Sequence, residues 1–200
     1  MGKIFILIGK SASGKDAIYR RLLENDELNL KPYVGFTTRP IRSGERDGRE
    51  YFFTDMQELK KFEASGRLIE KRIYHTIYGD WCYFTVDSDK TDFRNNDYLY
   101  ICTLESYIPV RDYYGEERVV PIFIQVDDGV RLQRALDREK AQAEPKYAEL
   151  CRRFLADEED FAEEKIQEAR ITRRFDNDDL EECVQEICSY IRDVQSHCEQ

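Results

Sequence analysis

The sequence has few of the residues that build metal centres, and it lacks any long apolar segment. It contains two histidines, and none of its six cysteines forms a C-x-x-C pair, so the spacing of a zinc site is missing. The apolar run at residues 4–8 is too short to cross a bilayer or to form the core of a signal peptide. The net charge of −10 argues against a general nucleic-acid or membrane-surface binder. We therefore expect a cytoplasmic protein with reduced thiols that binds neither nucleic acid nor membranes.

The composition that remains is typical of one folded domain. Of the 200 residues, 41% are hydrophobic and 36% are charged, which indicates a globular chain rather than a disordered one. This length suits a single domain, with or without a small insertion. The sequence shows no internal repeat, low-complexity tract or linker, and nothing in it indicates an oligomeric state.

Short apolar runs alternate with helical patterns along most of the chain. The runs are rich in β-branched and aromatic residues, as in strands buried on both faces. Such strands are expected at residues 4–8, 98–103, 119–126 and 171–175, and a further one begins at Tyr33. Helices are expected at residues 16–24, 56–65, 129–144, 147–169 and 180–191. The alternation predicts an α/β fold with a parallel sheet flanked by helices, whereas residues 33–90 are polar and carry short strands.

The stretch GKSASGKD at residues 9–16 has the spacing of a phosphate-binding loop, G-x-x-x-x-G-K-[ST], up to its last position. It follows an expected strand and opens an expected helix, which is the context that such a loop requires. In these loops the backbone N–H groups hold phosphate oxygens, and the lysine reaches the β- and γ-phosphates. The pattern predicts that ATP is bound by Gly9, Ser11, Ala12, Ser13, Gly14 and Lys15.

Asp16 stands where the pattern has a serine or threonine hydroxyl. A carboxylate is a good oxygen ligand for Mg²⁺, and the strand at residues 98–103 brings no acidic residue before Glu105. We therefore hypothesise that Asp16 supplies the carboxylate for Mg²⁺ that this strand lacks. The alternative, that Asp16 is only a favourable residue in the first turn of a helix, stays open.

Residues 37–51, TTRPIRSGERDGREY, form a second informative stretch. Arg39 and Arg42 lie three residues apart in a segment shaped by proline and glycines, and two guanidinium groups can clamp one phosphate through bidentate hydrogen bonds. The hydroxyl of Tyr51 could complete the phosphate site. On composition alone, a solvated basic loop is the favoured interpretation of these residues.

Together with the phosphate loop, this stretch resembles the guanylate kinase family, whose pattern T-T-R-x-x-R-x-G-E-x-x-G-x-x-Y it matches at every fixed position. The resemblance continues through LIEKRIYHTIYGD, RALDRE, LCRRF and FDNDDLEECVQEI. It implies a nucleoside monophosphate kinase with a P-loop NTPase fold, in which ATP, with Mg²⁺ as cofactor, phosphorylates GMP or a closely related monophosphate in purine nucleotide metabolism. It also implies a core of residues 1–32, 91–128 and 165–200, an acceptor-binding insertion at about 33–90 and a helical lid at about 135–160.

By the same resemblance, the acceptor site would comprise Arg39, Arg42, Tyr51, Glu70, Tyr78, Asp80 and Thr103. Arginine and tyrosine side chains in this set would hold the acceptor phosphate, and Glu70 would accept hydrogen bonds from the guanine. The ATP site would add Arg134, Arg138 and Asn177, the last near the adenine. Catalysis is expected from Lys15, Arg42, Arg138 and Arg153, with Arg152 as the alternative to Arg153.

Three positions near the expected base site depart from the family pattern. Gly35 and Asp80 replace hydroxyl residues, and Thr103 replaces an aspartate. An ionised Asp80 only accepts hydrogen bonds, so it would repel guanine O6. The opening with its G-K-D ending also resembles ribose 1,5-bisphosphate phosphokinases. A kinase for a sugar phosphate and a non-catalytic binding module therefore remain as alternatives.

Overall fold

The computed structural model describes residues 2–42, 44–76 and 79–196. Its central sheet has five parallel strands in the order β2-β7-β1-β8-β9. Their bounds are β1 Ile4–Ile8, β2 Leu30–Pro32, β7 Asp97–Ile101, β8 Val119–Gln125 and β9 Arg174–Asp176. β1 lies at the centre, and all of its side chains are fully buried. This position explains why the strand is apolar throughout instead of alternating.

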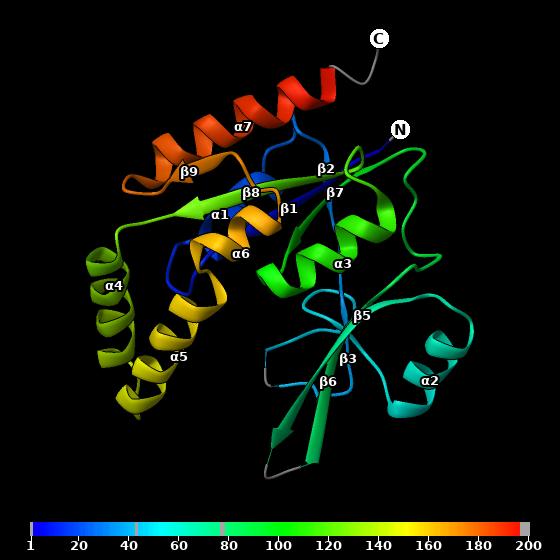
Figure 1. Ribbon diagram of the computed structural model, residues 1–200, viewed down its shortest axis with the longest axis horizontal. Coiled ribbons are helices and arrows are strands. Elements are labelled where there is room, and N and C mark those ends of the chain that lie inside the picture. The colour runs from blue at the N-terminus through cyan, green and yellow to red at the C-terminus, as the bar shows by residue number, and fades with distance from the viewer. Residues whose placement is uncertain (1, 43, 77–78, 197–200) are drawn as a thin grey trace.

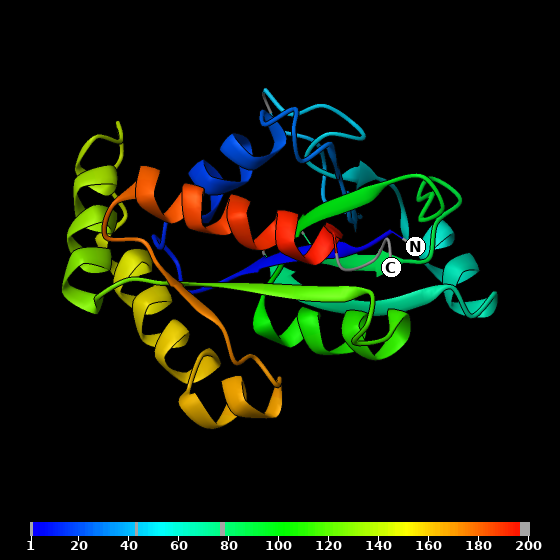
Figure 2. The same ribbon diagram turned by 90° about the horizontal axis from the view of Figure 1, so that it is seen from above.

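Helices cover both faces of the central sheet. Helices α1 (Lys15–Leu23) and α7 (Leu180–Ser196) lie on one face, and α3 (Leu104–Tyr114) and α6 (Glu163–Glu168) lie on the other (Figure 1, Figure 2). Because side chains alternate along a strand, Phe5 and Leu7 pack in one core layer, while their neighbours in β1 pack in the other. The predicted parallel sheet flanked by helices is confirmed.

A second sheet lies below the central one in Figure 1. Its strands have the order β4-β3-β6-β5, with bounds β3 Phe36–Thr37, β4 Phe52–Phe53, β5 Leu68–Thr76 and β6 Gly79–Val86. Helix α2 (Met56–Ala64) packs on one face of this sheet through Leu59, which joins Phe36, Cys82 and Phe84 in a separate small core. The other face is left for the candidate site.

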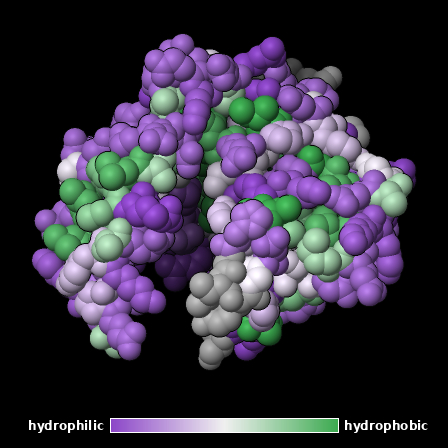
Figure 3. Space-filling view, turned by 60° about the horizontal axis from the view of Figure 1, so that its bottom comes forward, coloured by the Kyte–Doolittle hydropathy of each residue, from purple (hydrophilic) through white to green (hydrophobic). Residues whose placement is uncertain are grey.

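Helices α4 (Asp128–Lys140) and α5 (Tyr147–Asp160) extend from the carboxyl end of β8, on the side opposite to the second sheet (Figure 1). The space-filling view shows a deep cleft with hydrophilic walls between these two parts (Figure 3). This shape suits a chain that binds charged ligands between two lobes. The functional division into core, acceptor-binding insertion and lid stays a prediction.

Helix α3 was not expected from the sequence. Both apolar and polar residues of this helix are buried, among them Tyr107, Ser106 and Arg111, so no amphipathic stripe marks it. Pro109 lies within the helix, which further hides the pattern. Its start does carry a local signal, because the Thr103 hydroxyl caps the helix by accepting a hydrogen bond from the Ser106 N–H.

Three expected boundaries differ from the observed ones. The last strand begins at Arg174, because Arg170 takes a left-handed conformation (φ 57°) and Ile171 turns into the core instead of pairing. The helix expected over residues 147–169 is divided at Phe161, whose buried ring joins the same core. The strand expected from Tyr33 instead precedes this residue as β2, which ends at a proline on the sheet edge.

Candidate functional site

The loop between β1 and α1 has the conformation that the glycine spacing requires. Gly9 (φ 153°) and Gly14 (φ 90°) both have positive φ angles. A Cβ atom on Gly14 would lie 2.3 Å from Asn177 Nδ2, and one on Gly9 would lie 2.5 Å from the Ile124 carbonyl oxygen. Larger residues are therefore excluded at both positions by backbone conformation and by space.

Lys15 folds back into this loop. Its Nζ donates hydrogen bonds to the carbonyl oxygens of Gly9 (2.6 Å) and Lys10 (2.8 Å). Burial lowers the Lys15 pKa to about 8, although the carboxylates of Asp16 and Asp157 act in the opposite direction. The amine is thus protonated at neutral pH, and its charge lies at the centre of the expected phosphate site.

Asn177 joins this loop to the segment after β9. The buried side chain donates from Nδ2 to the Ser13 carbonyl oxygen (2.7 Å), and Arg134 Nη2 donates to the Asn177 carbonyl oxygen (3.0 Å). Asn177 Oδ1 is buried without a hydrogen-bond partner in the described part of the chain. The contact of Asn177 with adenine stays a prediction.

Asp16 lies in the first turn of α1 and is exposed. It lines the same cavity as Tyr51 and Arg72, so the end of the phosphate loop and the second sheet open into one space. Among the described residues, no group of three or more acidic, histidine or cysteine side chains is arranged as a metal site. A single carboxylate beside phosphates fits Mg²⁺, which keeps several waters and takes its remaining ligands from the substrate.

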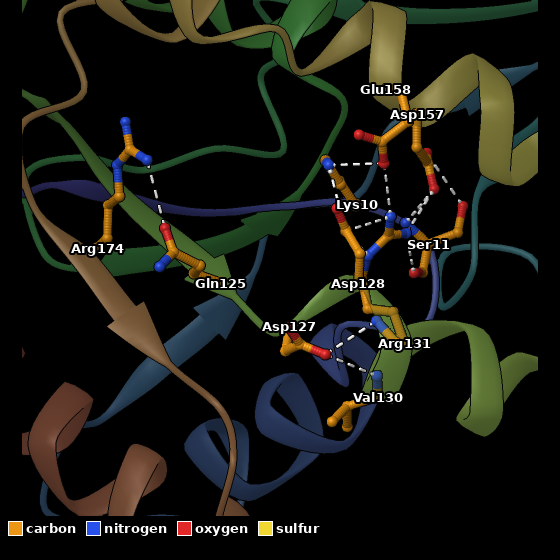
Figure 4. A network of polar contacts seen from close by, with 11 residues as sticks. Lys10, Ser11, Gln125, Asp127, Asp128, Val130, Arg131, Asp157, Glu158 and Arg174 are labelled. Carbon is orange, nitrogen blue, oxygen red and sulfur yellow. Dashed lines mark hydrogen bonds and ion pairs between the residues drawn. The ribbon is translucent and has the colours of Figure 1, made fainter.

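A network of ion pairs connects the phosphate loop to α4 and α5 (Figure 4). At its centre Arg131, of which 1% is exposed, donates to the Ser11 carbonyl oxygen (3.0 Å) and to Asp157 Oδ2 (3.2 Å). Asp157 in turn accepts a hydrogen bond from the Ser11 N–H (2.8 Å). Asp128, Glu158 and Lys10 complete the network at its exposed side.

Sequence reasoning missed Arg131. The hydropathy pattern predicts the opposite burial, because the neighbouring apolar residues Val130 and Leu132 are exposed while the arginine is buried. Its partners Ser11 and Asp157 are distant in sequence, so no local spacing could have revealed the contact.

The arginines expected in the lid are exposed. Arg152 Nε lies 2.7 Å from Glu149 Oε2, and Arg153 Nε lies 3.8 Å from the other oxygen of the same carboxylate. Arg138 is exposed near the end of α4. All three lie on the helices at one side of the cleft, and their contacts with ATP stay predictions.

The open face of the second sheet carries Glu70, one of the expected acceptor residues. Glu70, Arg72 and Tyr74 alternate along β5 on this face, opposite Thr85, Tyr83 and Trp81 of β6. The side chain of Glu70 is 6% exposed, and its Oε1 accepts a hydrogen bond from Thr85 Oγ1 (2.7 Å). The Tyr100 hydroxyl of β7 then donates to Thr85 (3.0 Å), because the Thr85 proton is already committed to Glu70. A carboxylate is therefore held in place within this face.

Arg39 is also fixed. Only 3% of this residue is exposed, and its two Nη atoms lie 2.9 Å and 2.8 Å from the oxygens of Glu45. Hydrogen bonds from this guanidinium lower the Glu45 pKa to about 2. The Nε atom donates to the Tyr83 hydroxyl (3.1 Å), and the guanidinium carbon lies 5.7 Å from the centre of the Tyr51 ring. Arg42 is exposed next to this group.

The structure does not bring every expected acceptor residue together. Asp80 lies on the opposite face of the hairpin from Glu70, and its Oδ1 is 2.7 Å from His75 Nδ1. The reason is the register, in which Asp80 faces His75 while Glu70 faces Thr85. A contact between Asp80 and the acceptor base is therefore not supported by this arrangement. Tyr78 lies outside the described residues.

Thr103 and Gly35 do border the site. The Thr103 hydroxyl oxygen accepts a hydrogen bond from Arg72 Nη1 (3.4 Å), and a Cβ atom on Gly35 would lie 3.5 Å from the Tyr100 hydroxyl. Sequence reasoning missed Arg72. The available signal was its spacing of two residues from Glu70 in an expected strand, which places both side chains on one face.

Comparisons with known proteins agree on one family. A sequence model described as guanylate kinase matches residues 1–90. The guanylate kinase of Porphyromonas gingivalis is 28% identical over 190 residues, which cover 94% of this chain and 95% of that protein. The guanylate kinase of Zymomonas mobilis is 41% identical over 80 residues, which cover 39% of this chain and 36% of that protein.

Structural similarity supports the fold. The crystal structure of guanylate kinase from Anaplasma phagocytophilum aligns with a TM-score of 0.58 at 24% identity, and the alignment covers 96% of this chain and 85% of that one. This confirms the predicted P-loop NTPase fold. In the part of the chain that the structure describes, no helix has the length and apolar character needed to span a membrane.

Proposed function

We propose that the chain is a member of the guanylate kinase family and transfers the γ-phosphoryl group of ATP to GMP, forming ADP and GDP, a proposal that its similarity to guanylate kinases supports. One observation carries the proposal: a single cavity reaches from Asp16, beside the phosphate loop, to Tyr51 and Arg72 on the acceptor face. A donor phosphate held by the loop and an acceptor phosphate held near Tyr51 would thus share one space. Phosphoryl transfer depends mainly on such positioning and on stabilisation of charge.

At the donor end, the loop N–H groups and Lys15 would bind the ATP phosphates. The Lys15 amine now donates to two backbone carbonyl oxygens, and phosphate oxygens would replace these neutral acceptors with charged ones. Arg134 and Asn177 would lie beside the nucleoside. Mg²⁺, when bound, would neutralise phosphate charge, and Asp16 is the residue that would hold it.

At the acceptor end, Arg39, Arg42 and Tyr51 would bind the phosphate of GMP. Arg39 is oriented in advance by Glu45 and Tyr83, so its guanidinium loses little freedom when the substrate arrives. Glu70 would accept hydrogen bonds from the guanine, because its carboxylate is buried and held by Thr85.

The lid would complete the catalytic site when it closes on ATP and excludes water. Of the two candidate arginines on α5, Arg153 is the less committed, since its nearest contact with Glu149 is 3.8 Å whereas Arg152 makes two short hydrogen bonds to the same residue. This supports Arg153 as the catalytic arginine, acting with Arg138. The division into core, insertion and lid belongs to the same proposal, as does a cytoplasmic location, which the free thiols of Cys82, Cys102, Cys151, Cys183 and Cys188 support.

The test is ADP release from ATP and Mg²⁺ with GMP, dGMP, AMP, UMP or ribose 1,5-bisphosphate as acceptor. We expect turnover with GMP and dGMP, and none in a Lys15→Met variant. Turnover restricted to the sugar bisphosphate would replace the proposed acceptor. ATP binding without turnover of any acceptor would contradict the proposed reaction, and a failure to bind ATP would favour a non-catalytic module.

A further inference from the structure

The half-buried arginine beside Glu70, Arg72, lines the shared cavity but has no assigned role in substrate binding so far. Arg72 lies two residues after Glu70 on the same face of β5, and 19% of its side chain is exposed. Its Nε atom lies 3.5 Å from Glu70 Oε2, without a hydrogen bond to it. Lys71, between them, points to the opposite face and pairs with Glu63. The chain thus places one cation and one anion side by side in the acceptor pocket.

The guanidinium of Arg72 is poorly satisfied in the protein alone. Nε is buried and has no hydrogen-bond partner among residues 2–42, 44–76 and 79–196. Nη1 makes one long hydrogen bond to the Thr103 hydroxyl (3.4 Å). Leaving a charged donor buried without a hydrogen bond costs free energy, so such a group calls for an explanation.

Arg72 stays charged in this setting. Burial acts against the charge, but Glu70, Tyr74 and Tyr100 together outweigh it, and the Arg72 pKa is raised above its usual value. The side chain borders two openings, one shared with Tyr51, Tyr74 and Trp81 and the other with Asp16 and Tyr100. Arg72 therefore borders the space in which the acceptor would bind.

The edge of guanine matches this pair of side chains. Its N1–H and exocyclic amino groups are donors that suit the Glu70 carboxylate, and its O6 is an acceptor next to them that suits an arginine. We propose that Arg72 is a specificity-determining residue that donates hydrogen bonds to guanine O6 while Glu70 accepts from N1–H and the amino group. This inference rests on the proposed function and names the residue that selects its acceptor base.

The same pair would reject adenine. Adenine carries an amino donor where guanine carries O6, so its donor would face the donors of Arg72. Its unprotonated N1 would face the Glu70 carboxylate. A site with buried polar groups discriminates strongly because the wrong base leaves these groups unpaired.

Arg72 also accounts for the position of Asp80. A carboxylate at the base would repel O6, but Asp80 lies on the other face of the hairpin and pairs with His75. Gly35 offers no side chain either. Arg72, whose Nε atom lies 3.5 Å from Glu70 Oε2, is thus a charged donor beside Glu70 that would take the O6 contact.

The experiment compares kcat/KM for GMP, 6-thio-GMP and 7-deaza-GMP. Sulfur is a weak acceptor, so 6-thio-GMP loses the O6 contact, whereas 7-deaza-GMP keeps it. The wild type should prefer GMP to 6-thio-GMP by about ten- to a hundredfold and should use 7-deaza-GMP nearly as well as GMP. In Arg72→Met, which keeps most of the side-chain volume, the preference for GMP over 6-thio-GMP should shrink to about twofold, as expected for the loss of one charged contact.

Lys71→Met is the matched control, because it removes a cation from the same strand on the opposite face. Its preference for GMP should equal that of the wild type. If Arg72→Met fails to fold, the wild-type comparison still decides, since equal use of GMP and 6-thio-GMP would overturn the Arg72 assignment. An unchanged preference in a folded Arg72→Met would overturn it as well. A wild type that does not phosphorylate GMP at all would instead refute the proposed function.

Discussion

Arg131 provides a sharp test of how the phosphate loop is held. We expect Arg131→Met to lower the free energy of unfolding by about 3–5 kcal/mol, which is the cost of leaving a buried ion-pair partner alone. The partner in question is Asp157, whose side chain is 12% exposed and lies 3.2 Å from the guanidinium. The contacts with Asp128 and Glu158 contribute little, because both carboxylates are largely exposed and screened by water. Methionine nearly fills the same volume, so the loss reports charge rather than a cavity.

The assay is urea unfolding followed by circular dichroism, with Arg152→Met as the matched control. Arg152 also pairs with a carboxylate, Glu149, but on the surface of α5, so its loss should leave the unfolding midpoint unchanged. Adding Asp157→Asn to Arg131→Met should restore part of the lost stability, since the second change removes the unpaired charge. The Asp157 amide oxygen can still accept from the Ser11 N–H in that variant.

An Arg131→Met midpoint equal to that of Arg152→Met would refute the reasoning. So would a double variant less stable than the single one, because it would show that Asp157 was not left as an uncompensated charge. In either case the network would be a surface feature with no bearing on the loop. If the reasoning holds, the KM for ATP should also rise in Arg131→Met, as the Ser11 carbonyl oxygen loses its anchor.

Three other predictions concern the phosphate loop. Because the Lys15 pKa is about 8, ATP affinity measured by calorimetry should fall as the pH rises through 8, where the free protein loses this positive charge, and Lys15→Met should abolish the dependence. Gly14→Ala should eliminate ATP binding, and adding Asn177→Ala should not restore it. The second change removes the 2.3 Å clash with Asn177, but residue 14 would still have to adopt a φ of 90°. ATP binding by the double variant would show that the clash alone excludes larger residues. Asp16→Asn should raise the Mg²⁺ concentration needed for half-maximal turnover, whereas an unchanged requirement would mean that Asp16 only favours the start of α1.

The sequence predicted those structural features that are determined by residues close together in the chain. Glycines at 9 and 14 are required by backbone conformation, so the loop could be read from its spacing. β1 could be read from its unbroken apolar run, because a central parallel strand is buried on both faces. Helix α3 was not predicted, because it is buried on several sides and therefore lacks the hydrophobic periodicity from which a helix is predicted.

Features that depend on distant contacts could not be read in this way. The orientation of Asp80 follows from the register of β5 and β6, and a shift of one residue would have turned it toward Glu70. The role of Arg131 depends on Ser11, far away in the sequence. The position of Arg72 could be predicted only in part. Its spacing from Glu70 in the sequence places both side chains on one face of the sheet, but the packing of α2 determines which face stays open.

The charges of the cleft explain how a chain with a net charge of −10 can receive two phosphorylated substrates. Two of its arginines are paired within the protein, Arg39 with Glu45 and Arg72 with Glu70. Each carboxylate holds its arginine in place and offsets its charge until an anion arrives. Lys15 differs, because its hydrogen bonds go to backbone carbonyl oxygens. Burial lowers its pKa to about 8, although the carboxylates of Asp16 and Asp157 act in the opposite direction. A phosphate is the partner that would restore the balance at Lys15, and this supports the loop as the place where ATP binds.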